Sequence, residues 1–173
     1  MLSINKIFYT FLTNLFINIG NARPLRAHHK EEITLIQIIA GTKGKGKTKI
    51  LIEKVNKEVS SATGNIVYLD KSNKHMYELS NKIRLINVKD YHIESEDEFL
   101  GFISGIISCD HDLQSIFLDS FLTIAYINDD NIERVFNKLE EISNHFKINI
   151  CASVSLNYEQ IPDNMKDNVI VSL

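Results

Sequence analysis

Gly41-Thr42-Lys43-Gly44-Lys45-Gly46-Lys47-Thr48 is the stretch that decides the fold, because it fits G-x-x-x-x-G-K-[ST] at every fixed position. Its glycines permit backbone conformations that other residues avoid, so successive N–H groups can turn inward around a phosphate. A helix that begins at Lys47 would add free amides and a partial positive charge, which favour an anion. We expect Lys47 to reach the β- and γ-phosphates of a nucleotide and the Thr48 hydroxyl to bind Mg²⁺. A flexible surface loop rich in Gly and Lys is the alternative interpretation.

The segments around this loop alternate between two patterns. Residues 33–40 are apolar and β-branched, as in a strand buried on both faces, whereas residues 47–60 place apolar side chains at helical spacing. Further strands are expected at 65–70, 83–88, 115–119, 148–154 and 168–173, and further helices at 95–108 and 130–146. Strands separated by helices imply crossover connections. We therefore predict an α/β fold with three layers, α/β/α, around a mainly parallel sheet.

Asp119 is the candidate metal ligand outside the loop. It ends the apolar run Ser115-Ile116-Phe117-Leu118-Asp119, which has the pattern of a strand. The carboxyl ends of parallel strands lie at the edge of the sheet where ligands bind, so Asp119 is expected beside the phosphate-binding loop. There it would hold Mg²⁺ with Thr48, directly or through water. A carboxylate that merely caps a turn is the alternative.

Residues 33–173 resemble the P-loop nucleoside-triphosphatase superfamily, and their spacing is most similar to that of small RecA-like ATP-binding domains of bacteria. Some proteins of that kind are labelled twitching-motility proteins. The resemblance rests on GTKGKGKT at 41–48, on SIFLDS at 115–120 and on YLD at 68–70. It implies a RecA-like core with ATP and Mg²⁺ as ligands.

The same resemblance implies roles for individual residues. In that group a carboxylate near the end of the second strand activates the attacking water, and Asp70 occupies a similar place. The strand that ends at Ser153 and Ser155 resembles the polar sensor strand of the group. A glutamate directly after the metal-binding aspartate is common, but Ser120 occupies that position here.

The composition of the chain indicates which binding partners and which cellular compartment to expect. The 173 residues include 22 acidic and 19 basic ones, a formal net charge of −3, which gives no electrostatic reason to expect a nucleic acid. Two cysteines, Cys109 and Cys151, are too few for the disulfide framework of a secreted protein. We expect a cytoplasmic protein whose main partner is a nucleotide.

Residues 1–32 are expected to form an N-terminal amphipathic segment and linker, separate from a P-loop domain over 33–173. The apolar-rich run 7–19 is too short and too polar to span a bilayer, but five of its apolar residues share one helical face: Phe8, Leu12, Leu15, Phe16 and Ile19. Such a helix would dock on the domain, on a protein partner or at a membrane surface. There are two alternatives for this segment. It could be a signal sequence, or it could be extra sequence translated from an upstream start codon.

Three classes of function fit these features. The preferred one is an Mg-ATP-binding domain with weak or partner-stimulated ATPase activity, in which Lys47 and Asp70 are the catalytic residues. A neighbouring subunit or another protein would supply the arginine that such reactions use. The second class is a small-molecule phospho- or adenosyltransferase, and the third is a non-hydrolysing regulatory module controlled by its bound nucleotide. The chain lacks an Asn/Thr-Lys-x-Asp guanine signature at the expected loop, which favours adenine.

Overall fold

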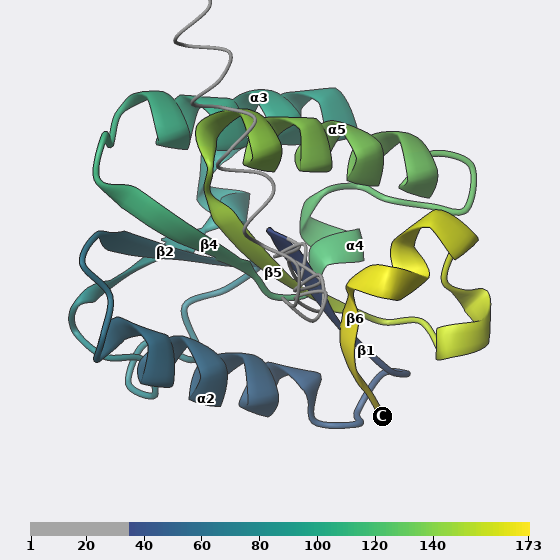
Figure 1. The fold of residues 1–173 in the computed structure, drawn as a ribbon, viewed down its shortest axis with the longest axis horizontal. Helices are drawn as coiled ribbons and strands as arrows, with labels where there is room; N and C mark the ends of the chain where they lie inside the picture. Colours follow the sequence, from purple (N-terminus) through teal and green to yellow (C-terminus); the bar gives the residue numbers. More distant parts are fainter. Residues whose placement is uncertain (1–34) are drawn as a thin grey trace, which may run out of the picture. The chain divides into compact units, whose positions relative to one another are not determined.

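The computed structural model describes residues 35–173, shown in colour in Figure 1. The prediction of a separate segment over 1–32, with its helix at 7–19, lies outside the described residues.

A single six-stranded sheet forms the centre of the described chain, and all its neighbouring strands are parallel. Its strand order is β3-β2-β4-β5-β1-β6. The strands are β1 (Ile36–Ala40), β2 (Asn65–Asp70), β3 (Ile83–Asn87), β4 (Leu113–Leu118), β5 (Asn149–Val154) and β6 (Val169–Ser172). The prediction of an α/β fold is confirmed, and the sheet is wholly rather than mainly parallel.

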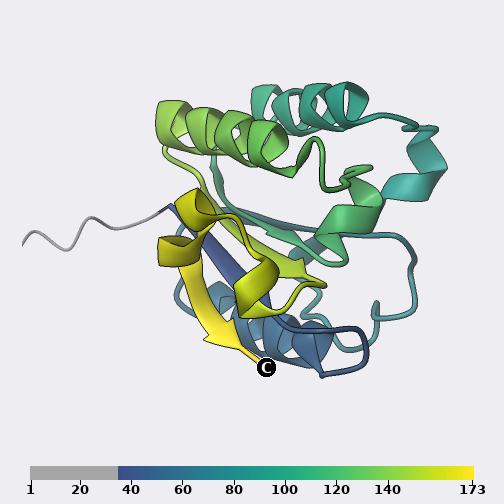
Figure 2. The same ribbon diagram turned by 90° about the vertical axis from the view of Figure 1, so that its right-hand side faces the viewer.

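Helices cover both faces of this sheet. On one face lie α3 (Glu96–Ser108) and α5 (Ile132–Phe146), and on the other lies α2 (Lys47–Val59), as Figures 1 and 2 show. This arrangement is compatible with the predicted three layers. Four short helical segments were not predicted, because three to six residues are too few for a periodic pattern: α4 (Phe121–Ile124) and the 3-10 turns Val88–Tyr91, Tyr158–Gln160 and Asp163–Asn168.

Two apolar cores, one on each face, hold the layers together. Strand residues contribute to them alternately: Ile116 and Leu118 of β4 pack under α3 and α5, whereas Phe117 between them packs toward α2. All three are at most 1% exposed. This double burial explains why the central strands are nearly continuous apolar runs.

The start of α3 shows how closely a local pattern fixes a boundary. The Ser95 hydroxyl accepts a hydrogen bond of 3.3 Å from the Glu98 amide, which is the first bond of a capping box. The Glu98 carboxylate, however, accepts from the amide of Glu94 at 2.7 Å rather than from that of Ser95. The helix therefore begins where predicted, with its second capping bond moved by one residue.

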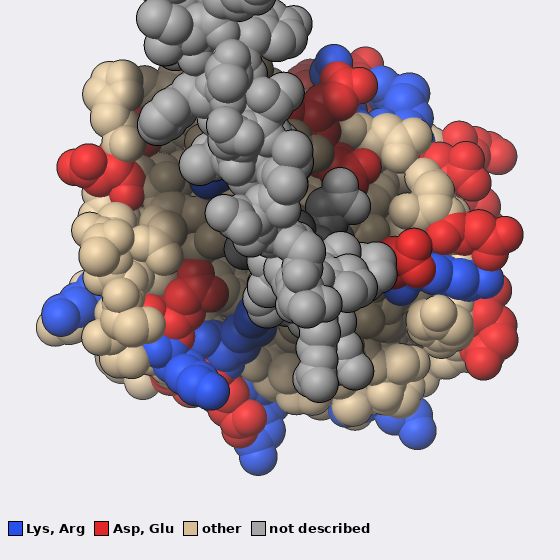
Figure 3. All heavy atoms as spheres, viewed as in Figure 1, with Lys and Arg blue, Asp and Glu red and all other residues tan. Residues whose placement is uncertain are grey.

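Within residues 35–173, no helix has the length and apolar character needed to cross a bilayer. Figure 3 shows acidic and basic side chains on the same face of the molecule, with acidic ones gathered on the side where α5 begins.

Candidate functional site

The loop between β1 and α2 curls rather than extends, because three glycines have positive φ angles. These angles are +146° at Gly41, +88° at Gly44 and +90° at Gly46. At Gly41 space also matters: an added Cβ would lie 2.9 Å from both the Cβ and the carbonyl oxygen of Leu173. Glycine is thus required at Gly41 both by its conformation and by the close approach of Leu173.

Two backbone amides of this loop are paired: those of Gly41 and Lys45 donate to the carbonyl oxygens of Leu156, at 2.8 Å, and Thr42, at 3.4 Å. Among the residues that the structure describes, none accepts a hydrogen bond from the amides of Gly44, Gly46, Lys47 or Thr48. Gly46 caps α2 in a left-handed conformation and supplies no side-chain hydrogen bond. The N-terminus of α2 therefore has free donors for an anion.

Lys47 is held inside the loop. Its Nζ donates to the carbonyl oxygens of Gly41 at 2.5 Å and of Thr42 at 2.8 Å, and the residue is 7% exposed. Burial lowers the pKa of Lys47, and the negative charge of Asp119 partly opposes this effect. The ammonium group of Lys47 thus lies inside the curled loop, at the carbonyl oxygens of its first two residues.

Asp119 directly follows β4 and joins three elements. It is 3% exposed and accepts hydrogen bonds from Thr48 Oγ1 at 2.9 Å, from Ser153 Oγ at 2.6 Å and from the Ser120 amide at 2.9 Å. Ser153 lies on β5, the strand between β1 and β4. Thr48 and Asp119, which the sequence analysis paired as metal ligands, are therefore in direct contact.

Asp70 ends β2 at the same edge of the sheet and is 2% exposed. Its carboxylate accepts a hydrogen bond of 2.6 Å from the Lys71 amide. Burial raises the pKa of Asp70, and the nearby charge of Asp119 raises it further. The structure thus brings Asp70 and Asp119 together, because parallel strands end at the same edge of the sheet.

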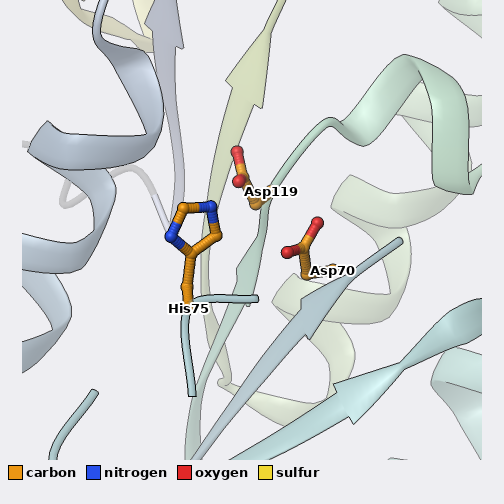
Figure 4. A group of neighbouring side chains, drawn as sticks. All are labelled: Asp70, His75 and Asp119. Carbon is orange, nitrogen blue, oxygen red and sulfur yellow. The ribbon is translucent and has the colours of Figure 1, made fainter. Parts of the chain in front are cut away.

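His75 belongs to the same group of side chains, although the sequence analysis did not identify it. One ligand atom each of Asp70, His75 and Asp119 lie within 4.8 Å of one another (Figure 4). His75 Nδ1 lies 2.6 Å from Glu78 Oε1. Because His75 occurs in the irregular segment between β2 and β3, no periodic pattern or motif marks it.

A pocket of about 640 Å³ opens between the glycine-rich loop at 41–48 and the segment after β2. This volume is typical of small-molecule sites. Of the predicted site residues, six line the pocket: Lys43, Gly44, Gly46, Lys47, Thr48 and Asp119. The other four, Gly41, Thr42, Lys45 and Asp70, are not among the lining residues. Lys71, His75, Glu78 and Ser153 line it as well.

No arginine lines this pocket within the described part of the chain. Arg84 is exposed on the edge strand β3, and Arg134 forms ion pairs with Glu96 at 2.8 Å and Asp97 at 2.9 Å. Arg134 is therefore engaged in ion pairs at the surface, away from this pocket.

No protein-family model matches the chain, and no curated protein is significantly similar to it.

Proposed function

We propose that residues 33–173 form a P-loop NTPase domain with a RecA-like core, which binds Mg-ATP and hydrolyses it weakly or when a partner stimulates it. The observation that carries this proposal is the contact between Thr48 Oγ1 and Asp119 Oδ2, at 2.9 Å, beside a curled loop with free amides. A hydroxyl and a carboxylate are the oxygen ligands that Mg²⁺ prefers. The residues present therefore fit the ion that the sequence resemblance implies.

The phosphate-binding loop supplies the donors for the nucleotide. The amides of Gly44, Gly46 and Lys47 would surround the phosphates, and Lys47 would exchange its two carbonyl acceptors for phosphate oxygens. Bound Mg²⁺ would neutralise phosphate charge between Thr48 and Asp119. Catalysis of this kind consists mainly of positioning and charge neutralisation, and the loop amides, Lys47 and the bound ion would provide both.

Asp70 is the residue that we assign to orienting the attacking water. It ends β2 next to Asp119, and its carboxylate is fixed by the Lys71 amide. An aspartate in this position can accept a proton from water as the oxygen attacks.

Two features support slow hydrolysis by the isolated protein. Ser120 follows Asp119 where a glutamate is common, and no described arginine lines the pocket. An arginine provided by a partner or a second copy is worth about 10³–10⁵ in rate in phosphoryl-transfer enzymes. The same two features favour the second candidate function, a regulatory module that binds nucleotide without hydrolysing it.

Isothermal titration of the full chain with Mg-ATP tests the binding proposal. We expect binding by the wild-type protein, a large loss of affinity in Lys47→Ala, and little change in Lys45→Ala, whose residue belongs to the same loop but does not line the pocket. Absence of binding at millimolar nucleotide, or unchanged affinity in Lys47→Ala, would contradict the proposal. Mass spectrometry of nucleotide that co-purifies with the protein would identify the base.

Steady-state release of ADP separates the two candidate functions. An ATPase releases ADP at a constant rate that Asp119→Asn abolishes, whereas a regulatory module binds Mg-ATP and releases no ADP above the background rate.

A further inference from the structure

The segment between β2 and β3 brings an imidazole to two buried carboxylates. Figure 4 shows the His75 ring beside Asp70 and Asp119, and their ligand atoms lie within 4.8 Å of one another. Ligand atoms around one ion at about 2.1 Å lie up to about 4 Å apart. A small inward movement of His75 would therefore let all three residues coordinate the same ion.

Within residues 35–173, neither Asp70 nor Asp119 forms an ion pair with a basic side chain. Asp70 and Asp119 are 2% and 3% exposed, so water screens their repulsion poorly. Lys47 is the nearby ammonium group that the sequence analysis identified, but its Nζ donates to the carbonyl oxygens of Gly41 and Thr42. A dication between the carboxylates would remove this repulsion.

Glu78 orients the imidazole as a metal site requires. Its Oε1 lies 2.6 Å from His75 Nδ1, and a carboxylate at this distance accepts a hydrogen bond from the ring. Nε2 then keeps its lone pair for a metal. Histidine ligands in metalloproteins usually donate their second ring N–H to a carboxylate in this way.

Tyr68 provides an independent observation. Its side chain is completely buried, and within the described residues its hydroxyl has no hydrogen-bond partner. Tyr68 lies two residues before Asp70 on β2, so the two side chains point to the same face of the sheet. An orphaned hydroxyl among these carboxylates is expected where a ligand, such as water on an ion, is missing.

We propose that Asp70, His75 and Asp119 form a site for a first-row transition-metal dication, which binds there in preference to Mg²⁺ and without nucleotide. Imidazole nitrogen is a good ligand for transition metals, whereas Mg²⁺ selects oxygen ligands. The site shares Asp70 and Asp119 with the proposed nucleotide site, but its occupation does not require ATP.

Calorimetric titration of the nucleotide-free full chain with MnCl₂ and with MgCl₂ tests the inference. We expect Mn²⁺ to bind at least about tenfold more tightly than Mg²⁺ to the wild-type protein, and His75→Ala to lose this preference. His111→Ala is the matched control, because His111 is an exposed histidine outside the site. The double variant His28→Ala/His29→Ala is the control for the histidine pair outside the described residues. Both controls should keep the preference for Mn²⁺.

Electron spin-echo spectroscopy of the Mn²⁺ complex adds a direct measurement. Nitrogen coupling from a coordinated imidazole should appear in the wild-type protein and disappear in His75→Ala. Circular dichroism would verify that His75→Ala is folded. Equal affinities for Mn²⁺ and Mg²⁺, or a preference and nitrogen coupling that survive in His75→Ala, would overturn the inference. Neither result depends on ATP binding, so this inference and the proposed function can fail separately.

Discussion

The hydroxyl of Thr48 donates a hydrogen bond of 2.9 Å to Oδ2 of Asp119, a residue 71 positions later in the chain. The contact joins the first turn of α2 to the end of β4. Because Asp119 also accepts from Ser153 on β5, one carboxylate connects three elements that are distant in the sequence.

Asp119→Asn should abolish the dependence of nucleotide binding on Mg²⁺. The amide oxygen in the place of Oδ1 can still accept from Ser153, at 2.6 Å, and from Thr48, at 3.2 Å, so the fold should persist, but the charge that attracts the ion is lost. ATP affinity measured with Mg²⁺ and with EDTA should therefore differ in the wild-type protein and agree in the variant. Asp112→Asn, at an exposed residue outside the pocket, should behave like wild type.

Ser153→Ala should lower the free energy of unfolding by about 1–3 kcal/mol. Ser153 Oγ donates to Asp119 at 2.6 Å and accepts from the Ser120 amide at 2.8 Å, and the residue is 1% exposed. Alanine would leave these buried groups with one partner fewer. Urea unfolding measures the loss, and Ser155→Ala, at an exposed residue on the edge of the same pocket, should show little change.

Asp70→Asn should stabilise the metal-free protein at neutral pH. Burial and the charge of Asp119 raise the pKa of Asp70 in the folded state, so the folded protein holds this proton more tightly than the unfolded chain does. Stability therefore falls as pH rises from the ordinary aspartate pKa through the raised one. Asparagine removes this effect because it does not titrate.

Unfolding midpoints in urea with EDTA, at pH 7 and near pH 4, measure the difference. The advantage of Asp70→Asn over the wild-type protein should be largest at pH 7 and shrink toward pH 4. An advantage that is constant or grows as pH falls would show that the Asp70 carboxylate is not destabilised by its surroundings.

Gly41→Ala should destabilise the fold by about 1–3 kcal/mol, because alanine disfavours its φ of +146° and the new Cβ would lie 2.9 Å from Leu173. Gly101→Ala is the matched substitution. An added Cβ at Gly101, within α3, meets nothing within 4 Å, so alanine there should stabilise the helix by up to about 1 kcal/mol. Thermal unfolding of the two variants should show shifts of opposite sign.

The class of fold was predictable from the sequence because each element has a strong local pattern. The predicted strand at 65–70 matches β2 at both ends, and the helix from Lys47 ends within one residue of its predicted end. The order of the strands was not predictable in the same way. Both β5 and β4 lie between β1 and β2, and this placement depends on packing between segments far apart in the chain.

Part of the candidate site was predictable from the sequence and part was not. The proximity of Thr48 and Asp119 followed from a motif and from the rule that parallel strands end at one edge. His75, Lys71 and Glu78 escaped notice, because they belong to an irregular segment whose path follows from tertiary contacts alone. The binding roles assigned to the loop and to the two aspartates remain predictions.

The two carbonyl oxygens that accept from Lys47 would affect which anions the loop can bind under the proposed function. An entering anion competes with these internal acceptors for the ammonium group. A chloride or a single sulfate offers few contacts in return, whereas a polyphosphate meets the lysine and several amides at once. Under the proposed function, we therefore expect this loop to favour a chain of phosphates over chloride or a single sulfate.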